Sequence, residues 1–300
     1  MTFKRLKNLA RKIINAKTYQ QRAQIMRAYA YRTGKVKQRG TYGYYFMKLA
    51  RVFDYYAKNN TGNSPDLFSI FSGKNTKLHY VNFSTLPGFT CPGAGKCLEW
   101  CYSFKAWRNP AVFCRQLQNT ILLDNRKSVI RAAWNKLKPD IYVRLYVDGD
   151  IDSIETLGFW FSLLNTRPDL KSWGYSKSWN LFVDWHKQGL KFPDNYCLNI
   201  SSGSIYDNDN ALKSAVLELP ITRGEFIAVD LDGHYSKGFD RYDDINYHRE
   251  VRSKLRADYP DNNAFSCTGK CHDCLPSKTL GNRPACAVVE LDFNIGNGTH

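Results

Sequence analysis

Hydrophobic and polar positions repeat with two different periods along this chain, and the change of period separates two segments. Up to residue 58, apolar side chains recur at helical spacing, as in Leu6, Leu9 and Ile13, with lysines and arginines between them. The pattern predicts three helices, over residues 6–14, 18–33 and 43–58. Asparagine, glycine and serine dominate residues 59–65, a composition typical of a linker.

Beyond the linker, strand-like runs alternate with helical stretches. The predicted strands are 79–85, 141–147, 172–176, 196–201 and 226–231, and the predicted helices are 110–137, 153–165, 179–188 and 208–217. Such alternation predicts β-α-β units and a parallel sheet. The expected fold class is α/β, with a parallel (β/α) barrel-like or partial-barrel core and a basic helical N-terminal arm. The expected domains are the arm with its linker, residues 1–64, and the barrel-like cysteine-cluster domain, residues 65–300.

Charge is distributed unevenly between these segments. The first sixty residues hold fifteen lysines and arginines against one acid, Asp54, a net charge of +14, whereas the other 240 residues sum to +2. A concentrated basic segment favours a polyanionic partner, so we expect nucleic acid to bind the arm. Its aromatic residues, among them Phe46 and Tyr56, are expected either to stack on bases or to pack the arm onto the barrel. Binding of a basic amphipathic helix to an anionic membrane surface is the alternative.

The chain has no sequence signal for a membrane or for secretion. No apolar run approaches the ~20 residues that span a bilayer, and no apolar core follows the N-terminal charges. We therefore expect a cytoplasmic protein with no transmembrane segment. In a reducing compartment, clustered cysteines are more often metal ligands or catalytic groups than disulfides, and nine is an odd number for a closed disulfide set.

Three cysteines, Cys91, Cys97 and Cys101, lie within eleven residues on a loop rich in glycine and proline. The loop follows a predicted strand and precedes a long predicted helix, and its composition lets three thiols converge on one centre. Thiolates are soft ligands suited to zinc or to an iron–sulfur cluster. The plainer interpretation, in which the cysteines are small buried hydrophobic residues, fits a polar turn poorly.

A second group comprises Cys267, Cys271 and Cys274, with Cys286 further along the chain. Gaps of three and two residues between thiols are typical of metal sites, and Cys286 or His272 could complete a set of four. The alternative is a structural zinc site that fastens the C-terminal tail. Cys114 and Cys197 fall in a predicted helix and a predicted strand, and we expect both in the core.

Polar side chains follow several of the predicted strands: Asp148, Asp150, Lys177 and Ser201. The carboxyl ends of parallel strands hold the ligand site in α/β folds. The two aspartates could hold a ribose, a substrate amine or a divalent cation, or could serve only as turn and capping residues. Lys177 is expected to bind an anion or to act as a counter-charge, and Ser201 with the Gly/Ser loop after it could grip a nucleotide.

Several well-known catalytic motifs are missing. The chain contains no phosphate-binding loop, no nucleophile elbow and no H-E-x-x-H helix. This argues against an ATPase, an α/β-hydrolase and a zincin. The two cysteine groups are thus the strongest chemical signal in the sequence.

The first cysteine loop resembles that of radical S-adenosylmethionine enzymes, in which a 4Fe–4S cluster held by three thiolates leaves one iron open for the cosubstrate. Those enzymes are (β/α) barrels with the cluster loop after the first strand. An aromatic residue and a tyrosine often flank their last cysteine, as Trp100 and Tyr102 flank Cys101 here. The C-x5-C-x3-C spacing departs from theirs. The resemblance implies a 4Fe–4S cluster and S-adenosylmethionine as cofactors, with zinc as the alternative metal.

A closer resemblance is to the phage gene-product-88 family, proteins of largely unassigned function encoded by bacteriophages and mobile elements. It is carried by Leu86-Pro87, Thr90-Cys91-Pro92-Gly93-Ala94-Gly95, Cys97, Cys101-Tyr102, Asn119, Arg144, Gly149-Asp150, Pro168 and Trp173-Gly174-Tyr175-Ser176-Lys177. The chain departs from the family by Asp148 where serine is common and by Ser176 for threonine. The resemblance covers about residues 67–290. It implies a cysteine-bound cluster and a phage or mobile-element origin, hence the cytoplasm of a bacterial host, and supplies no reaction.

Three functions stay open at this point. The first is a radical-SAM-like iron–sulfur enzyme that acts on or near nucleic acid. The second is a non-enzymatic replication or regulatory protein that binds nucleic acid and whose iron–sulfur or zinc site is structural. The third is a zinc-stapled scaffold without chemistry.

Overall fold

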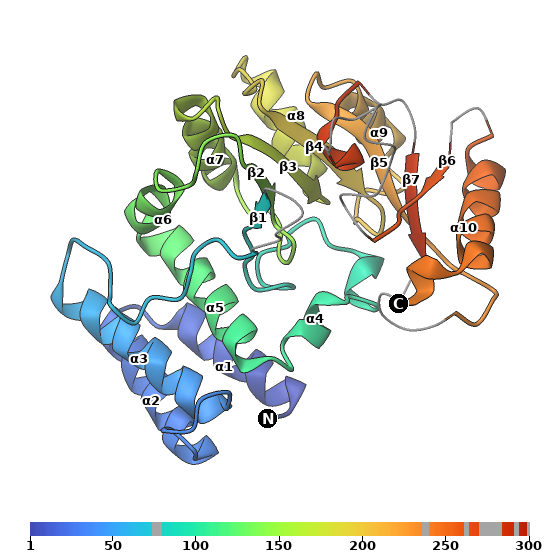
Figure 1. Cartoon of the computed structure of the whole chain (residues 1–300). Coiled ribbons are helices and arrows are strands. Elements are labelled where there is room, and N and C mark those ends of the chain that lie inside the picture. Colours follow the sequence, from blue (N-terminus) through green and yellow to red (C-terminus); the bar gives the residue numbers. More distant parts are fainter. Residues whose placement is uncertain (74–79, 236–239, 261–263, 270–283, 291–293, 299–300) are drawn as a thin grey trace. The chain divides into compact units, whose positions relative to one another are not determined.

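The computed structural model describes the chain except for residues 74–79, 236–239, 261–263, 270–283, 291–293 and 299–300 (Figure 1). The α-helices of the described residues are α1 (Phe3–Asn15), α2 (Tyr19–Thr33), α3 (Tyr42–Lys58), α4 (Ser103–Ala106), α5 (Pro110–Asn125), α6 (Lys127–Trp134), α7 (Ile154–Thr166), α8 (Trp179–Lys187), α9 (Asn210–Leu217) and α10 (Ile245–Asp258). The strands are β1 (Tyr80–Asn82), β2 (Tyr142–Leu145), β3 (Lys171–Ser176), β4 (Tyr196–Ser201), β5 (Thr222–Val229), β6 (Ala264–Ser266) and β7 (Asn294–Gly298).

These elements form two compact units. The first comprises Met1–Phe71, Ser84–Pro87 and Tyr102–Lys136, and the second Ser72–Phe83, Gly88–Cys101 and Leu137–His300. The division differs from the boundary expected after residue 64, because the helical unit also contains α4, α5 and α6. The Phe46 ring of α3 lies 6.2 Å from the Phe113 ring of α5, so α3 and α5 share one hydrophobic core.

The helical unit begins with three helices that are each capped by a threonine. Thr2, Thr18 and Thr41 accept a hydrogen bond from a backbone N–H in the first turn of α1, α2 and α3. Thr18 and Gln21 form a reciprocal capping box, which confirms the helix start expected there. The apolar face of α1, which includes Leu9 and Ile13, is fully buried within the unit.

The aromatic residues of α3 belong to the core of this unit. Phe46 and Phe53 are fully buried, and Tyr56 is 2 % exposed. The Arg126 guanidinium lies 4.5 Å from the centroid of the Tyr56 ring. Buried rings cannot stack on nucleic-acid bases, so packing accounts for these three aromatics.

The second unit is built on a parallel sheet with the strand order β1-β2-β3-β4-β5-β7-β6. Every ladder in it is parallel. This confirms the expected α/β class. In the part of the chain that the structure describes, β1 and β6 are the two edges and are not paired with each other, which corresponds to the partial-barrel form.

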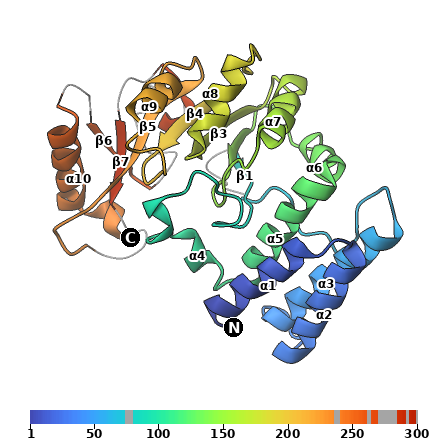
Figure 2. The ribbon, with the colours of Figure 1, turned by 180° about the vertical axis from the view of Figure 1, so that it is seen from behind.

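Helices α7, α8 and α9 lie together on one face of the sheet (Figures 1 and 2). Phe161 of α7 and Phe182 of α8 contact the Tyr196 ring of β4, with ring centroids 5.6 and 6.4 Å apart. The opposite face, which we call the aromatic face, carries Tyr80, Tyr142, Trp173, Tyr175 and Phe226. The segment Ala285–Val288 packs there against Trp173 and Cys197.

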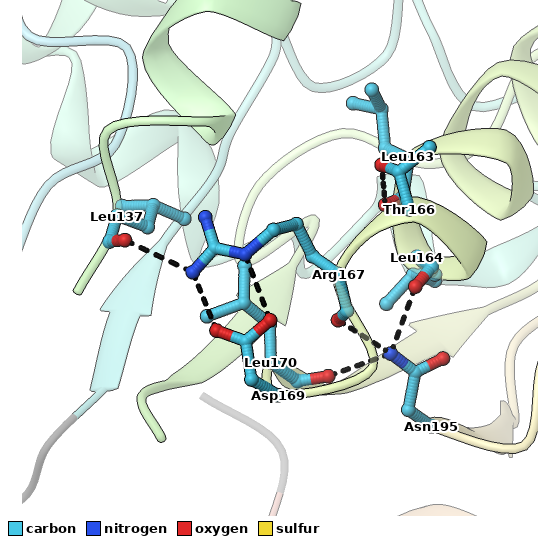
Figure 3. Close-up of polar contacts among 8 residues, drawn as sticks. All are labelled: Leu137, Leu163, Leu164, Thr166, Arg167, Asp169, Leu170 and Asn195. Carbon is cyan, nitrogen blue, oxygen red and sulfur yellow. Dashed lines mark hydrogen bonds and ion pairs between the residues drawn. The ribbon is translucent and has the colours of Figure 1, made fainter. Parts of the chain in front are cut away.

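The amino-terminal edge of the sheet is fastened by polar contacts between turns (Figure 3). The Arg167 guanidinium pairs with the Asp169 carboxylate at 2.5 Å and donates to the Leu137 carbonyl at 3.1 Å. The Asn195 amide donates to the carbonyls of Leu164, Arg167 and Leu170 at 3.1, 3.1 and 2.7 Å. These side chains join the turns that precede β3 and β4, and their contacts stabilise this edge of the sheet.

Several elements differ from the sequence expectation. The helix predicted over 110–137 is two helices, because Arg126 leaves the helical region with φ −156° and ψ 55°. The strand predicted at 226–231 runs from Thr222 to Val229. The pattern also missed α10, β6 and β7. Strands of three and five residues leave too short an alternation to be recognised.

Candidate functional site

The predicted site residues lie after consecutive parallel strands. The loop with the first three cysteines follows β1, Asp148 and Asp150 follow β2, Lys177 follows β3, and Ser201 ends β4. Because these four strands are parallel neighbours, their carboxyl ends meet at one edge of the sheet. The structure therefore brings the first cysteine group and the four predicted polar residues to the same edge.

Backbone hydrogen bonds anchor the cysteine loop to the segment after β4. The N–H groups of Gly95 and Cys97 donate to the Gly203 carbonyl at 2.9 and 3.2 Å. The Gly93 carbonyl accepts from the Ser204 hydroxyl and the Ile205 N–H, both at 3.0 Å. The Ser204 hydroxyl also lies 2.9 Å from the Lys177 carbonyl. Ser204 thus links the cysteine loop with the loops after β3 and β4.

The glycines of the cysteine loop are needed for this close approach. A Cβ on Gly93 would lie 2.0 Å from the Lys177 carbonyl oxygen, and one on Gly95 would lie 2.9 Å from backbone atoms of Ser204. Gly203 has φ +80°, and a Cβ there would come within 2.9 Å of the Cys97 Cβ. The glycines on both sides therefore allow the two loops to pack backbone to backbone.

The three thiols of the loop share one electrostatic neighbourhood. Burial raises the pKa of Cys91 to about 12, and the charges of Asp150, Cys101 and Cys97 act in the same direction. Burial also raises the pKa of Cys97, while the Lys177 ammonium opposes that shift. Cys101 is half-buried, and none of the three is in a disulfide.

Asp150 and Lys177 are held by a continuous set of hydrogen bonds. The Lys177 N–H donates to Asp150 Oδ2 at 2.8 Å, and the Ile151 N–H donates to Asp150 Oδ1 at 2.7 Å. Burial raises the pKa of the Asp150 carboxyl, although these donors favour its charged form. The Lys177 ammonium donates to the Ser201 hydroxyl at 2.7 Å. Asp150 thus connects the turns after β2 and β3, while the Lys177 ammonium is held in place by its bond to Ser201.

The turn after β2 has an unusual backbone. Tyr146 has φ 56°, in the left-handed region that a bulky residue rarely adopts, and Gly149 has φ 81°. Asp148, between them, is 9 % exposed. The Tyr146 hydroxyl accepts from the Trp160 indole N–H at 2.9 Å. The chain therefore turns sharply from β2 into the site and buries both aspartates.

The second cysteine group is described only in part. Cys271 and Cys274, with His272, lie outside the described residues. Cys267 directly follows β6, and Cys286 is 7 % exposed in the segment that packs against Trp173 and Cys197. Among the described residues, no three His, Cys, Asp or Glu side chains are arranged to hold a single metal ion. Cys114 is fully buried and Cys197 is 3 % exposed, as expected of core residues.

Sequence reasoning missed Asn199 as part of this region. Asn199 donates to the Cys286 carbonyl at 2.8 Å and accepts from the Arg223 Nε at 2.5 Å. Period-two alternation would have placed Trp173 and Tyr175 on one face. The contact of Ser204 with Gly93, which lies 111 positions earlier, has no signal in a single sequence.

The basic residues of the arm form a surface on α1 and α2. Arg11, Lys12 and Arg32 are exposed, and the Tyr29 ring lies 5.9 Å from the Lys12 ammonium and 6.0 Å from the Arg32 guanidinium. We call these three cations the basic surface. An open crevice of about 460 Å³ lies beside it, lined by Arg11, Lys12, Asn15, Ala16, Gln21, Gln24 and Ile25. Asp54 pairs with Arg27, so the acid of this segment neutralises a cation outside the basic surface.

Over the residues that the structure describes, no helix combines the length and apolar character needed to cross a membrane.

No curated protein and no solved structure matches this chain. The sequence pattern of the family described as Gene product 88 matches residues 50–281, which is more than half of the chain. This chain therefore belongs to the phage gene product 88 family.

Proposed function

We propose that this member of the gene product 88 family is an iron–sulfur enzyme, with a cluster bound by Cys91, Cys97 and Cys101 at the carboxyl edge of its parallel sheet. The observation that carries the proposal is the anchoring of the cysteine loop. Hydrogen bonds from Gly95, Cys97, Ser204 and Ile205 join it to the loop after β4, and Ser204 extends the connection to the loop after β3. A loop fixed in this way holds several thiols in one place, as a multi-thiolate site requires.

The donor set suits a cluster better than a zinc ion. Four ligands surround a single zinc ion tightly, whereas the thiolates of an iron–sulfur cluster bind different iron atoms and stand further apart. The three thiols of one loop influence one another electrostatically, which fits ligands that bind different iron atoms of one cluster. Cys267, Cys271, Cys274 and Cys286 are proposed to hold a second centre or to share the first.

The residues beside the thiols have separate tasks in this proposal. A cluster held by three thiolates supplies, when bound, an open iron at which a cosubstrate such as S-adenosylmethionine can be reduced. Lys177 provides a cation for a carboxylate or phosphate group, and its bond to Ser201 fixes the ammonium position. Asp150 keeps the turns after β2 and β3 together. Asp148 is the carboxylate proposed to contact an amine or a ribose hydroxyl.

Anaerobic purification with iron and acid-labile sulfide analysis tests the cluster. Cys97→Ser is expected to lose most of the iron, because metal-binding free energy is also folding free energy and this thiol is a ligand. The matched control is Cys114→Ser, which removes a buried thiol from the other unit and should keep the iron. Stoichiometric zinc in place of iron, or full iron in Cys97→Ser, would contradict the assignment.

Reduction with dithionite in the presence of S-adenosylmethionine tests the enzymatic step. The expected products are methionine and 5′-deoxyadenosine, with Lys177→Gln binding the cosubstrate more weakly and retaining its iron. A protein that holds its cluster but yields neither product would favour the second function, a nucleic-acid-binding protein with a structural cluster.

A nucleic-acid partner is proposed for the helical unit. It is supported by the basic surface, by the amide side chains in the crevice and by the net charge of +14 over the first sixty residues. The membrane alternative is disfavoured because a membrane-surface helix inserts its apolar face. Leu6, Leu9 and Ile13 of α1 are buried in the protein core.

A further inference from the structure

The crevice beside the basic surface is lined by residues of two helices that follow each other in the chain. They are Arg11, Lys12 and Asn15 of α1, Ala16 between the helices, and Gln21, Gln24 and Ile25 of α2. Its volume of about 460 Å³ falls within the ~300–1,000 Å³ of small-molecule sites. None of the lining residues is acidic. The crevice therefore suits a ligand that carries negative charge.

Two side-chain amides in the crevice are available to a ligand. Asn15 and Gln24 are exposed, and their amide groups form no hydrogen bond with any residue that the structure describes. The Gln21 amide oxygen is already engaged, because it accepts from the backbone N–H groups of Lys17 and Thr18 at 2.9 and 3.3 Å. A free carboxamide presents an acceptor and two donors side by side, the pattern that pairs with the edge of a nucleobase. Both free amides can therefore pair with a base that enters the crevice.

The crevice also offers an apolar contact and cations. Ile25 is half-buried, and its side chain can pack against the flat face of a base. Lys12 belongs to the basic surface as well as to the crevice, and the Tyr29 ring lies between its ammonium, at 5.9 Å, and the Arg32 guanidinium, at 6.0 Å. Arg11 is exposed and has no acidic partner within the described residues. Phosphates on either side of a base in the crevice can thus contact cations.

We infer that the crevice between α1 and α2 binds one unpaired base of a single strand of nucleic acid. Asn15 and Gln24 pair with the edge of the base, and Ile25 packs against its face. A base of a duplex is paired and stacked and has to leave the double helix before it can enter, so the crevice selects single strands. A strand fits better than a free nucleotide, because the cations continue beyond the crevice to Arg32. This selectivity rests on the nucleic-acid binding proposed above for the helical unit.

Fluorescence anisotropy with the full-length protein provides the test. The probes are a single strand of DNA, its RNA counterpart, the DNA duplex and a DNA single strand with abasic sites. Asn15→Ala/Gln24→Ala should bind the intact single strands about tenfold more weakly, because it removes two hydrogen-bonding groups, and should keep its affinity for the duplex and the abasic strand. A loss confined to DNA or to RNA identifies the natural strand. The matched control, Asn8→Ala/Gln20→Ala, removes exposed amides of the same two helices outside the crevice and should bind all four probes as the natural protein does.

The two amide variants should unfold at the same temperature, so that a difference between them reports on binding. Unchanged affinity of Asn15→Ala/Gln24→Ala for single strands would overturn the inference, as would an equal loss for single strands and duplex. The variant Arg11→Gln/Lys12→Gln/Arg32→Gln tests the basic surface separately. If only this variant weakens binding, the helical unit binds nucleic acid without an unpaired base in the crevice. If the natural protein binds none of the probes, the nucleic-acid partner itself is wrong.

Discussion

Gly93 lies so close to Lys177 that a Cβ on the glycine would stand 2.0 Å from the lysine carbonyl oxygen. The same carbonyl oxygen accepts from the Ser204 hydroxyl, so it cannot move without breaking that bond. The close approach of these two backbones therefore fixes the cysteine loop against the loop after β3.

Gly93→Ala is expected to push the cysteine loop away from the loop after β3. Overpacking against a backbone atom costs about 1–3 kcal/mol, and the displaced loop should bind iron less well. Iron content and thermal unfolding of the purified protein measure both effects. Gly189→Ala is the matched control, because its added Cβ meets nothing within 4 Å. Its only expected destabilisation comes from placing an alanine at the positive φ of +69°. A Gly93→Ala protein with full iron and unchanged unfolding would contradict the role given to this close approach.

We expect the free energy of unfolding to depend on pH through the carboxyl group of Glu250. Its carboxylate accepts from the Tyr235 hydroxyl at 2.6 Å and from the Asp232 N–H at 2.5 Å, and these bonds hold the pKa of Glu250 below its usual 4.5. Because the folded-state pKa is lowered, the stabilisation is present above the ordinary value and disappears as pH falls through the lowered one.

Urea unfolding from about pH 6 to about pH 3 measures this effect. Glu250→Gln should be less stable than the natural protein at the upper pH, and the difference between the two proteins should shrink on acidification. The size of the effect is limited because the group lies at the surface. A difference that stays constant over this range would rule out titration of Glu250 as its source.

Much of the fold follows from local pattern, and the rest depends on interactions between distant residues. Helices α1 to α3 and strands β2 to β4 appear at their predicted places because their periodicity is long or strongly apolar. The strand β7 and the start of β5 at Thr222 are set by pairing, as in the register of Phe226 with Ile295. Pairing between segments so far apart leaves no trace in a short run of residues.

The candidate site shows the same limit. Parallel strand order was enough to predict that Asp150, Lys177 and Ser201 share an edge with the first cysteines. The separate roles of Asp150 and Lys177 were not predictable, because they depend on which backbone N–H groups donate to Asp150 once the turns after β2 and β3 pack together.

We expect substitution of Asn195, at the opposite edge of the sheet, to lower the stability of the protein. Its amide donates at 2.7 to 3.1 Å to three carbonyls, one in the last turn of α7 and two in the turn between α7 and β3 (Figure 3). Asn195→Ala should lower the free energy of unfolding by about 1–3 kcal/mol, because it removes the donor of these carbonyls. Asp194→Ala, at an exposed neighbouring position, is the control and should change it little. Iron content should be unaffected in both variants, since neither residue lies at the carboxyl edge.

The basic surface predicts how nucleic-acid binding depends on salt. Truncating the arm would expose the core that α3 shares with α5, so substitution is the sharper test. The variant Arg11→Gln/Lys12→Gln/Arg32→Gln should bind single-stranded and duplex probes more weakly in fluorescence anisotropy. Each cation that neutralises a phosphate adds about 0.7–0.9 to the slope of log affinity against log salt, so removing three cations should reduce the slope by about 2–3. The control Lys171→Gln/Lys187→Gln/Lys191→Gln removes the same charge from exposed positions of the other unit. Equal effects of the two triple variants would mean that net charge, and not this surface, binds the nucleic acid.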